Sequence, residues 1–516
     1  MSNKSAMRSI IAKNAQAKNA NSAQILGTNI EIIPIVDWHI FRYNGAALKL
    51  GMMMQNDNPH SHSSSSANTS QNTDDSWFVK WQPYQGDLEQ TPVAIHEYLP
   101  AGQNVALGLQ HVFAMFGATV LAPLLMGFDP SLTMLMTGFS TILFFLITGG
   151  RVPSYLGSSF AFIGVVAAAT GYAGAGSNPN MSLALGGIMA CGIFYALVGL
   201  IVMRTGTQWI ERLMPPVVTG AVVMIIGLNL APITIKGVSG NVFDTWMALL
   251  TVLCITTIAV FTKGMLRRLL LLVGLALSYL FYFILANVMG LGTPIDFAPI
   301  INAAWIGLPQ LHSPSFDAKA ILLIAPVFII LIAENLGHFK AVSAMTGQNI
   351  SPYMGRAFFA DGLCTTISGA VGGTGMTTYA ENIGVMAATK IYSTVVFMVA
   401  GVFAILLGLS PKFGAVISTI PVAILGGASI VVFGLITIAG ARIWISNRVD
   451  FSQNGNMLVA AVVVIMGTGN FSLHLAGFDL GGIGTATFAA ILMNLIFNRQ
   501  SLGQENRDEH DAFSAH

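Results

Sequence analysis

Two acidic residues stand inside long apolar stretches of this 516-residue chain, where ionisable groups are rare. Glu334 precedes His338 by four residues, so the two side chains share one face of a helix. Glu381 lies in the polar, glycine-rich stretch 373–390. A charge at membrane depth costs roughly 2.5–3.5 kcal/mol, so it normally faces a bundle interior or a water-filled site. We therefore expect both carboxyl groups to bind a ligand, and Glu334 with His338 to exchange a proton.

Other chemistry is less well supported by these residues. A metal site would need a third ligand at suitable spacing, and we find none in the sequence, so no metal and no cofactor other than a coupling proton is expected. An enzyme would need a nucleophile with a base, and Ser158, Ser159 and His111 make a weak case, so no catalytic residue is predicted. A buried carboxylate satisfied only by neighbouring helices stays open as the alternative for each acid.

Three further residues are secondary candidates. His111 could join the proton network if the first and eighth spans pack together, although a hydrogen-bonded core histidine is an equal alternative. Asp361 could equally make a helix-to-helix hydrogen bond, worth on the order of 1 kcal/mol. Phe160 stands in a broken apolar segment, where its ring could stack on a planar ligand.

Membrane spans must hold these side chains. Hydrophobic residues make up 54% of the chain and charged residues only 9%, too few charges to cover a soluble protein of this size. Continuous apolar runs of about 20 residues match helices that cross a hydrocarbon core, and barrel strands would alternate instead. We predict an all-α polytopic membrane protein with fourteen transmembrane segments, at 104–127, 132–149, 154–170, 182–203, 215–235, 245–261, 269–290, 319–339, 357–372, 375–389, 391–409, 414–440, 457–470 and 483–498.

Charge sets the expected partners and orientation. The net charge of +1 gives no sign of a nucleic-acid partner, and the apolar spans make the lipid bilayer the expected surroundings. With the N-terminus inside, most basic residues next to the spans fall on the cytoplasmic side, and only Lys236, Lys319 and Lys412 fall outside. By the positive-inside rule, both termini are predicted to be cytoplasmic.

Two pairs of spans repeat one another. The matches are Ile163-Gly-Val in the third span with Ile383-Gly-Val in the tenth, and Pro215 with Gly220 in the fifth span with Pro421 and Gly426 in the twelfth. Seven spans separate the members of each pair, and because seven is odd the second copy enters the membrane in the opposite direction. We therefore predict a 7+7 inverted repeat, as in secondary transporters, with chance similarity as the alternative.

The third and tenth segments are short and interrupted by polar residues. Residues 155–162 and 376–381 are predicted to begin as short extended strands that lead into half-helices. Extended backbone at membrane depth is tolerated only where it is buried in protein or lines a cavity. If the two stretches cross near the midplane, each half-helix directs its N-terminal N–H groups at the same place, which suits ligand carbonyl or anionic oxygens.

Three motifs resemble those of the nucleobase:cation symporter 2 family, also called the nucleobase–ascorbate transporter family. They are Ala-Glu-Asn-Ile-Gly-Val-Met-Ala-Ala-Thr-Lys at 380–390, Glu-Asn-Leu-Gly-His at 334–338 and Tyr-Leu-Gly-Ser-Ser-Phe-Ala-Phe at 155–162. The resemblance runs over about 99–498 and is to the bacterial uracil permease branch, with its pyrimidine-utilisation members. It implies import of uracil, or of other pyrimidine bases, by proton symport across the inner (plasma) membrane, by a protein that forms homodimers.

The resemblance also implies a division into domains. A core domain holds spans 1–4 and 8–11, and a gate domain holds spans 5–7 and 12–14, with alternating access as one moves against the other. The corresponding ranges are 101–203 and 291–409 for the core, and 204–290 and 410–498 for the gate. By composition, 1–100 is a polar, disordered N-terminal tail and 499–516 a cytoplasmic tail.

In similar uracil permeases, residues at matching positions contact the base. The acids matching Glu334 and Glu381 accept its ring N–H groups. The aromatic residue matching Phe160 stacks on the ring, and the backbone around Tyr379 and Ala380 also contacts it. The resemblance thus predicts a substrate site from these five residues.

The histidine matching His338 belongs to the proton-coupling network, and Asp361 and Asn382 are possible selectivity positions. Purine-selective relatives tend to carry Gln where Glu381 stands, which favours uracil. Asp361 departs from close uracil permeases, which often have Asn there, and 374–375 stands in a turn where some relatives have Pro. A symporter of xanthine or uric acid is therefore the alternative, and an anion exchanger or channel on a similar scaffold is a more distant one.

Overall fold

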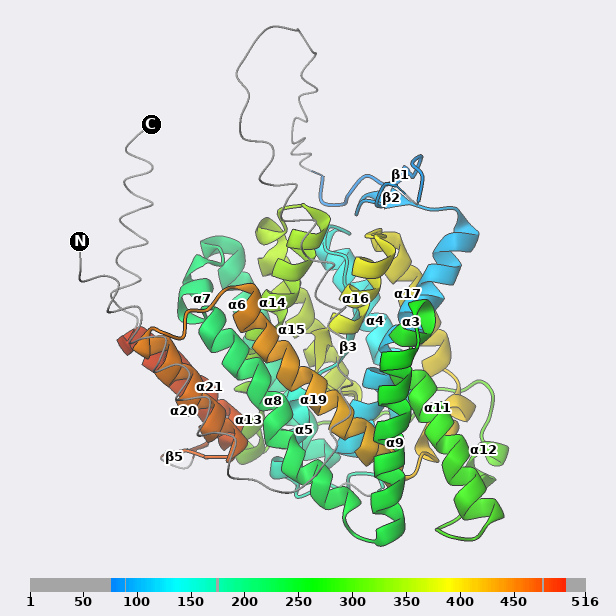
Figure 1. The fold of residues 1–516 in the computed structure, drawn as a ribbon. Coiled ribbons are helices and arrows are strands. Elements are labelled where there is room, and N and C mark those ends of the chain that lie inside the picture. Colours follow the sequence, from blue (N-terminus) through cyan, green and yellow to red (C-terminus); the bar gives the residue numbers. More distant parts are fainter. Residues whose placement is uncertain (1–75, 89, 173–175, 476–477, 498–516) are drawn as a thin grey trace, which may run out of the picture. The chain divides into compact units, whose positions relative to one another are not determined.

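The computed structural model describes residues 76–497, apart from 89, 173–175 and 476–477. This part of the chain is mostly helical, and its strands are very short (Figure 1). The first half contains α3 (Ala101–Met126), α4 (Pro130–Thr148), α5 (Ala161–Thr170), α6 (Met181–Thr205), α7 (Gln208–Leu213), α8 (Pro216–Val238), α9 (Val242–Phe261), α10 (Gly264–Arg268), α11 (Leu270–Phe283) and the π-helix η2 (Ile284–Val288). The second half contains α12 (Ala298–Asn302), α13 (Ala318–Ile324), α14 (Val327–Thr346), the 3₁₀ helix η3 (Ser351–Tyr353), α15 (Met354–Val371), α16 (Ala380–Thr389), α17 (Thr394–Gly408), α18 (Pro411–Ser418), α19 (Val422–Ser446), α20 (Asn454–Thr468) and α21 (Gly481–Phe497).

Helices cover most of the predicted apolar segments. Within the described residues, eight helical spans are long and apolar enough to cross a membrane, and a ninth arises if the bent pair α17–α18, with 79° between its helices, is one span. The predicted segment 414–440 is wrong in its bounds, because it is divided between α18 and α19. Pro421 stands at this break, and proline cannot supply the N–H that a continuous helix requires there.

Two short strands cross in the middle of the helices. β3 (Leu156–Ser158) and β4 (Met376–Thr378) pair antiparallel, with Gly157 opposite Thr377. The pairing is extended at both ends, where the Tyr379 N–H donates to the Tyr155 carbonyl at 3.0 Å and the Ser159 N–H to the Gly375 carbonyl at 2.9 Å. The predicted extended strands in the third and tenth segments are thus confirmed, and they satisfy each other's backbone groups without water.

The helices form two groups. The first helix group comprises α3–α6 and α13–α18, and the second comprises α8, α9, α11 and α19–α21. Within the first group α6 packs on α15 and α4 on α17, and within the second α8 lies beside α19 (Figure 1). Glycines line these contacts: a Cβ on Gly362 would lie 2.3 Å from the Ala196 nitrogen, and one on Gly138 would lie 2.4 Å from the Gly401 carbonyl oxygen. Small residues let membrane helices approach this closely.

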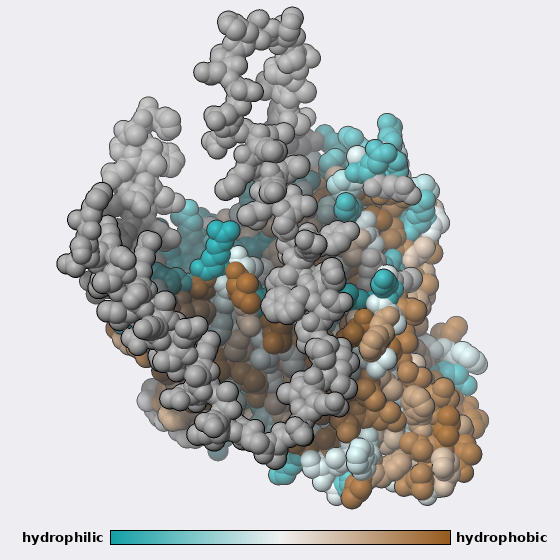
Figure 2. Space-filling model, in the orientation of Figure 1, coloured by the Kyte–Doolittle hydropathy of each residue, from teal (hydrophilic) through white to brown (hydrophobic). Residues whose placement is uncertain are grey.

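The contacts of the first seven predicted spans have counterparts among the last seven. The pair α3–α17 corresponds to α6–α13, α4–α17 to α6–α15, α9–α19 to α8–α20, and α9–α11 to α20–α21. The outward surface is apolar where a bilayer would lie, and Figure 2 shows hydrophobic side chains gathered over α9 and α11. Exposed residues there include Leu249, Leu253 and Val260 on α9 and Leu280 on α11.

The segment that precedes α3 packs on the first helix group. Trp81 stacks on Phe145 with 5.5 Å between ring centroids, and its Nε1 donates to the Thr394 hydroxyl at 3.2 Å. Val93 is fully buried and forms a parallel bridge with Ile391, just after α16. These contacts fasten the segment to the ends of α4, α16 and α17.

The predicted polar, disordered tail of 1–100 is therefore wrong for 76–100. That prediction rests on the His-, Ser- and Asn-rich stretch before residue 75, whereas the later part carries tryptophan and β-branched residues that bury apolar surface. The remainder of the predicted tail, 1–75, and the predicted cytoplasmic tail, 499–516, lie outside the described residues.

The strand crossing predicts one sensitive glycine. A Cβ on Gly375 would lie 2.1 Å from the Phe162 ring, whereas one on Gly384, in α16, would meet nothing within 4 Å. We expect Gly375→Ala to lower stability by about 1–3 kcal/mol, a typical cost of overpacking, and Gly384→Ala to leave it unchanged. The melting temperatures of the purified variants measure the difference, with the folded fraction at each temperature determined by size-exclusion chromatography. Equal melting temperatures for Gly375→Ala and the wild type would show that the crossing tolerates extra volume.

Candidate substrate site

A cavity of about 800 Å³ lies between the two helix groups. From the first group, α5, α14, β4 and α16 line it, and from the second group α8 and α19 do. Exposed Lys340, Arg442 and Asn447 stand among the lining residues and mark the open end. Buried Thr377 and Thr378 mark the deep end. The cavity is large enough for a small organic molecule, since ligand sites typically span about 300–1,000 Å³.

Two carboxyl groups face this cavity from different helices. Glu334 lies on α14, and His338 and Ala341 follow it on the same face at helical spacing; all three line the cavity. Glu381 lines it from the first turn of α16, near the positive end of the helix dipole. The polar residues that sequence patterning places in apolar segments therefore converge on one internal space.

The two half-helices begin beside these acids. α5 starts directly after Phe160 and α16 directly after Tyr379, and the residues on both sides of each start line the cavity. Phe160 lines the cavity, and its ring packs nearly perpendicular to that of Phe433, at 6.1 Å between centroids. The Tyr379 hydroxyl donates to the Ser158 carbonyl at 2.8 Å, so the first half-helix segment holds the second in place. N–H groups at helix starts are suited to ligand oxygens, and of those at these two starts the Ala161 N–H already donates to the Ser159 hydroxyl at 3.2 Å.

The structure divides the predicted site residues into two sets. Six of them line the cavity, namely Phe160, Glu334, His338, Tyr379, Ala380 and Glu381. His111, Asp361 and Asn382 are not among the lining residues and are buried. Any effect of these three on a ligand is therefore indirect.

His111, on α3, and Asn382, on α16, form a buried pair between these two helices. The Asn382 side-chain amide lies 3.0 Å from His111 Nδ1 and donates to the His111 carbonyl at 3.1 Å. The imidazole also packs against Phe397, at 4.6 Å between ring centroids. The pair ties α3 to the half-helix that carries Glu381, which agrees with a hydrogen-bonded core histidine.

Asp361, on α15, lies close to Asn335 of α14 and Tyr195 of α6. The Asn335 amide donates to Asp361 Oδ2 at 2.5 Å and to the Tyr195 hydroxyl at 2.7 Å. Asn335 is fully buried, and nothing in sequence patterning singled it out. A signal was present, because a residue that follows Glu334 directly must point away from the face shared with His338.

A salt bridge stands at the open end of the cavity. Lys340 Nζ lies 2.9 Å from Glu211 Oε2, which joins α14 to the short helix α7. The Thr207 hydroxyl donates to the other Glu211 oxygen at 3.0 Å. The positive charge of Lys340 is thereby balanced by the Glu211 carboxylate.

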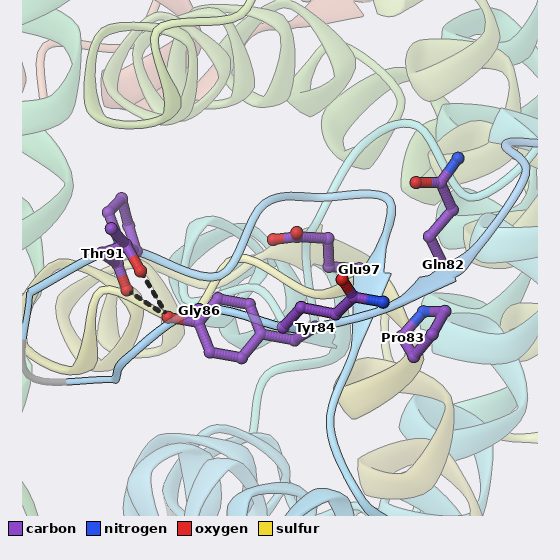
Figure 3. Close-up of a pocket in the computed structure, with 8 residues that line it drawn as sticks. Gln82, Pro83, Tyr84, Gly86, Thr91 and Glu97 are labelled. Carbon is purple, nitrogen blue, oxygen red and sulfur yellow. Dashed lines mark hydrogen bonds between the residues drawn. The ribbon is translucent and has the colours of Figure 1, made fainter.

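A second hollow, of about 360 Å³, lies before α3, around β1 (Gln82–Pro83) and β2 (Glu97–Tyr98). Figure 3 shows the Tyr84 hydroxyl directed at Thr91, whose carbonyl accepts from it at 2.8 Å. The Glu97 carboxylate already accepts from the Ala94 N–H at 2.8 Å. The polar groups of this second hollow are mostly exposed and already hydrogen-bonded. The cavity between the helix groups is therefore the candidate site.

Interrupted half-helices that meet at an internal cavity define a membrane transporter. A family model described as the permease family, Xan_ur_permease, matches residues 102–475. The chain belongs to this family, the nucleobase:cation symporter 2 transporters. It is 63% identical over 423 residues to RutG of Escherichia coli K12, described as a pyrimidine permease, covering 82% of this chain and 96% of RutG. It is 38% identical over 419 residues to the uracil permease of the same strain, covering 80% of this chain and 95% of that protein.

Solved structures share the fold at low sequence identity. The transmembrane domain of the cyanobacterial bicarbonate transporter BicA matches with a TM-score of 0.54 and 17% identity, over 75% of this chain and 97% of that one. Murine Slc26a9, an anion transporter in an inward-facing state, matches with a TM-score of 0.56 and 10% identity, over 77% of this chain and 68% of that one. The anion-exchanger alternative is therefore similar in fold alone, and the named relatives are permeases, not enzymes.

The cavity predicts which positions water-soluble reagents reach. The three native cysteines are all buried, so a single added cysteine reports its own surroundings. Ala341 and Ala344 line the cavity on α14, whereas Ala333 on the same helix is fully buried. We expect Ala341→Cys and Ala344→Cys to react with a charged maleimide many times faster than Ala333→Cys in the purified protein. Comparable rates at all three positions would contradict the cavity as described.

Proposed function

We propose that the protein imports uracil by proton symport. The observation that carries the proposal is the meeting of two carboxyl groups, two half-helix starts and one aromatic ring in a single cavity. The similarity to proteins named as pyrimidine and uracil permeases supports the substrate class.

The chemistry of uracil fits these groups. Uracil is flat and neutral, with two N–H donors and two carbonyl acceptors. Glu334 and Glu381 accept the N–H groups, the N–H groups at the helix starts meet the carbonyls, and Phe160 covers one face of the ring. Such a site rejects analogues that leave a buried partner unpaired. The same cargo class includes other pyrimidine bases, and xanthine or uric acid is the alternative cargo.

Proton coupling is assigned to Glu334 with His338. Protonation converts a carboxylate from an acceptor into a group that also donates, so the proton and the substrate each change the other's affinity by the same factor. His338 stands one turn further along the same face of α14, and its imidazole is a group that can take up and release a proton. His111, tied to Asn382, supports this network through α16 and does not contact the substrate.

Alternating access moves the first helix group, as the core domain, against the second, as the gate domain. The cavity between the groups and the corresponding helix contacts of the two halves support this division and the 7+7 inverted repeat. We further propose that both termini are cytoplasmic in the inner membrane, because basic residues cluster on that side, and that the protein is a homodimer.

Replacing Glu334 tests the proposal. In cells that lack their own uracil permeases, wild-type uptake of radiolabelled uracil should rise at low external pH, collapse with an uncoupler and ignore excess xanthine. Glu334→Gln should lower uptake at least about tenfold, the effect of about 1.4 kcal/mol, and remove its pH dependence. Asp296→Asn, an exposed acid far along the chain from the cavity residues, is the matched control.

Two results would contradict the proposal. If Glu334→Gln still accumulated uracil against a gradient in a pH-dependent manner, the proton assignment would be wrong. Binding of xanthine by a protein that does not take up uracil would indicate that the transported substrate is a purine.

A further inference from the structure

Every hydrogen-bonding group of the Asn335 side chain is occupied. Its Nδ2 donates to Asp361 Oδ2 at 2.5 Å and to the Tyr195 hydroxyl at 2.7 Å. Its Oδ1 accepts from the Thr378 backbone N–H at 3.3 Å and also from the Thr378 hydroxyl. Asn335, Asp361 and Thr378 are each fully buried, so water does not compete for these bonds.

These partners fix the orientation of the amide. A backbone N–H can only donate, so the Thr378 N–H requires the carbonyl oxygen of Asn335 on its side. On the other side, Asp361 Oδ2 accepts from the NH₂ group of Asn335. A flipped amide would place donor against donor at β4. The two ends of the Asn335 side chain therefore agree on one orientation.

The fixed amide in turn fixes the Thr378 hydroxyl. A hydroxyl carries one proton, and the contact with Asn335 Oδ1, an acceptor, uses it. The Thr378 oxygen is then left with lone pairs alone for its other neighbour, His338 Nδ1, at 2.8 Å. A bond between these two atoms requires the proton to be on the imidazole nitrogen.

We propose that Asp361, Asn335 and Thr378 act as positioning residues that hold neutral His338 as its Nδ1–H tautomer. The other ring nitrogen, Nε2, is then an unprotonated acceptor available to the cavity that His338 lines. The neutral histidine side chain in water favours the opposite tautomer, with the proton on Nε2. The series of hydrogen bonds from Asp361 through Asn335 to Thr378 thereby determines which nitrogen of His338 is protonated at the substrate site. Asp361 does this without contacting the substrate.

The tautomer assignment deepens the proposed function. The assignment itself rests on the hydrogen bonds, and only its consequence for transport rests on the proposed function. A proton that arrives from the cavity binds Nε2 and leaves the Nδ1–H bond to Thr378 in place, so the ring need not rotate when it is charged. The charged and titratable groups that share the cavity with this nitrogen are Glu334, Tyr379, Glu381, Lys340 and Arg442. The Tyr379 hydroxyl already donates to the Ser158 carbonyl, and Lys340 is paired with Glu211. The carboxyl groups are therefore the ones that exchange a proton with His338.

The tautomer can be measured directly in ligand-free protein. Nitrogen NMR of protein labelled with ¹⁵N-histidine in bilayers distinguishes the protonated from the unprotonated ring nitrogen at alkaline pH, where the ring is neutral. The chain has ten histidines, so the difference from a His338→Gln spectrum identifies the signals. We expect a protonated Nδ1 and an unprotonated Nε2 for His338. Protonation of Nε2 instead would overturn the proposal, whatever the protein transports.

Matched variants separate positioning from general damage. Thr378→Val removes the hydroxyl at nearly constant volume, and we expect the Nδ1–H signal to be lost and the pH profile of uptake to shift. Thr378→Ser keeps the hydroxyl, and Asp361→Asn keeps an acceptor facing Asn335, so both should retain the wild-type tautomer. An unchanged Nδ1–H signal in Thr378→Val would contradict the proposed role of this series of hydrogen bonds. If that variant does not fold, the wild-type spectrum still decides the question.

Discussion

The structure depends on the need to satisfy backbone groups where no water is available. β3 and β4 interrupt two spans deep among apolar helices, and each would leave N–H and carbonyl groups unpaired if it were alone. Pairing the strands with each other solves this and forces the two half-helices to start at the same depth. The convergence of helix starts on one cavity thus follows from a backbone requirement before any side chain contributes.

Side chains then give the cavity its chemistry. Glu334 and Glu381 stand half-buried beside apolar helices, where carboxyl groups are costly unless they have partners, and the proposed substrate has two N–H donors to offer them. Close helix packing through glycine keeps the surrounding helices rigid, while the cavity lies between the two helix groups where movement is possible. The same arrangement that destabilises an empty site therefore favours binding.

Sequence patterning predicted the elements that rest on local rules. The spacing of Glu334 and His338, the polar interruptions that became β3 and β4, and the apolar runs follow from periodicity and from the cost of polar groups in lipid. Tertiary placement was beyond such rules. The resemblance offers Asp361 and Asn382 as possible selectivity positions, and only the structure shows that both are buried outside the cavity lining.

Two further features depend on partners that lie far away in sequence. The contacts of Trp81 and Val93 with the ends of α4, α16 and α17 turn an expected tail into packed structure. The role of Asn335 depends on a carboxylate 26 residues away and on a hydroxyl 43 residues away. Local patterns carry no information about such pairs without knowledge of which helix faces meet.

The central claim is that two carboxyl groups each take one ring N–H of a pyrimidine. Equilibrium binding of uracil, 1-methyluracil and 3-methyluracil to the purified protein tests it most directly, with 5-fluorouracil as a control that keeps both N–H groups. The account predicts that either N-methylation abolishes measurable binding, because it removes a donor and leaves a buried acceptor unpaired, while 5-fluorouracil still binds. Binding of both methylated bases as tightly as uracil would contradict it.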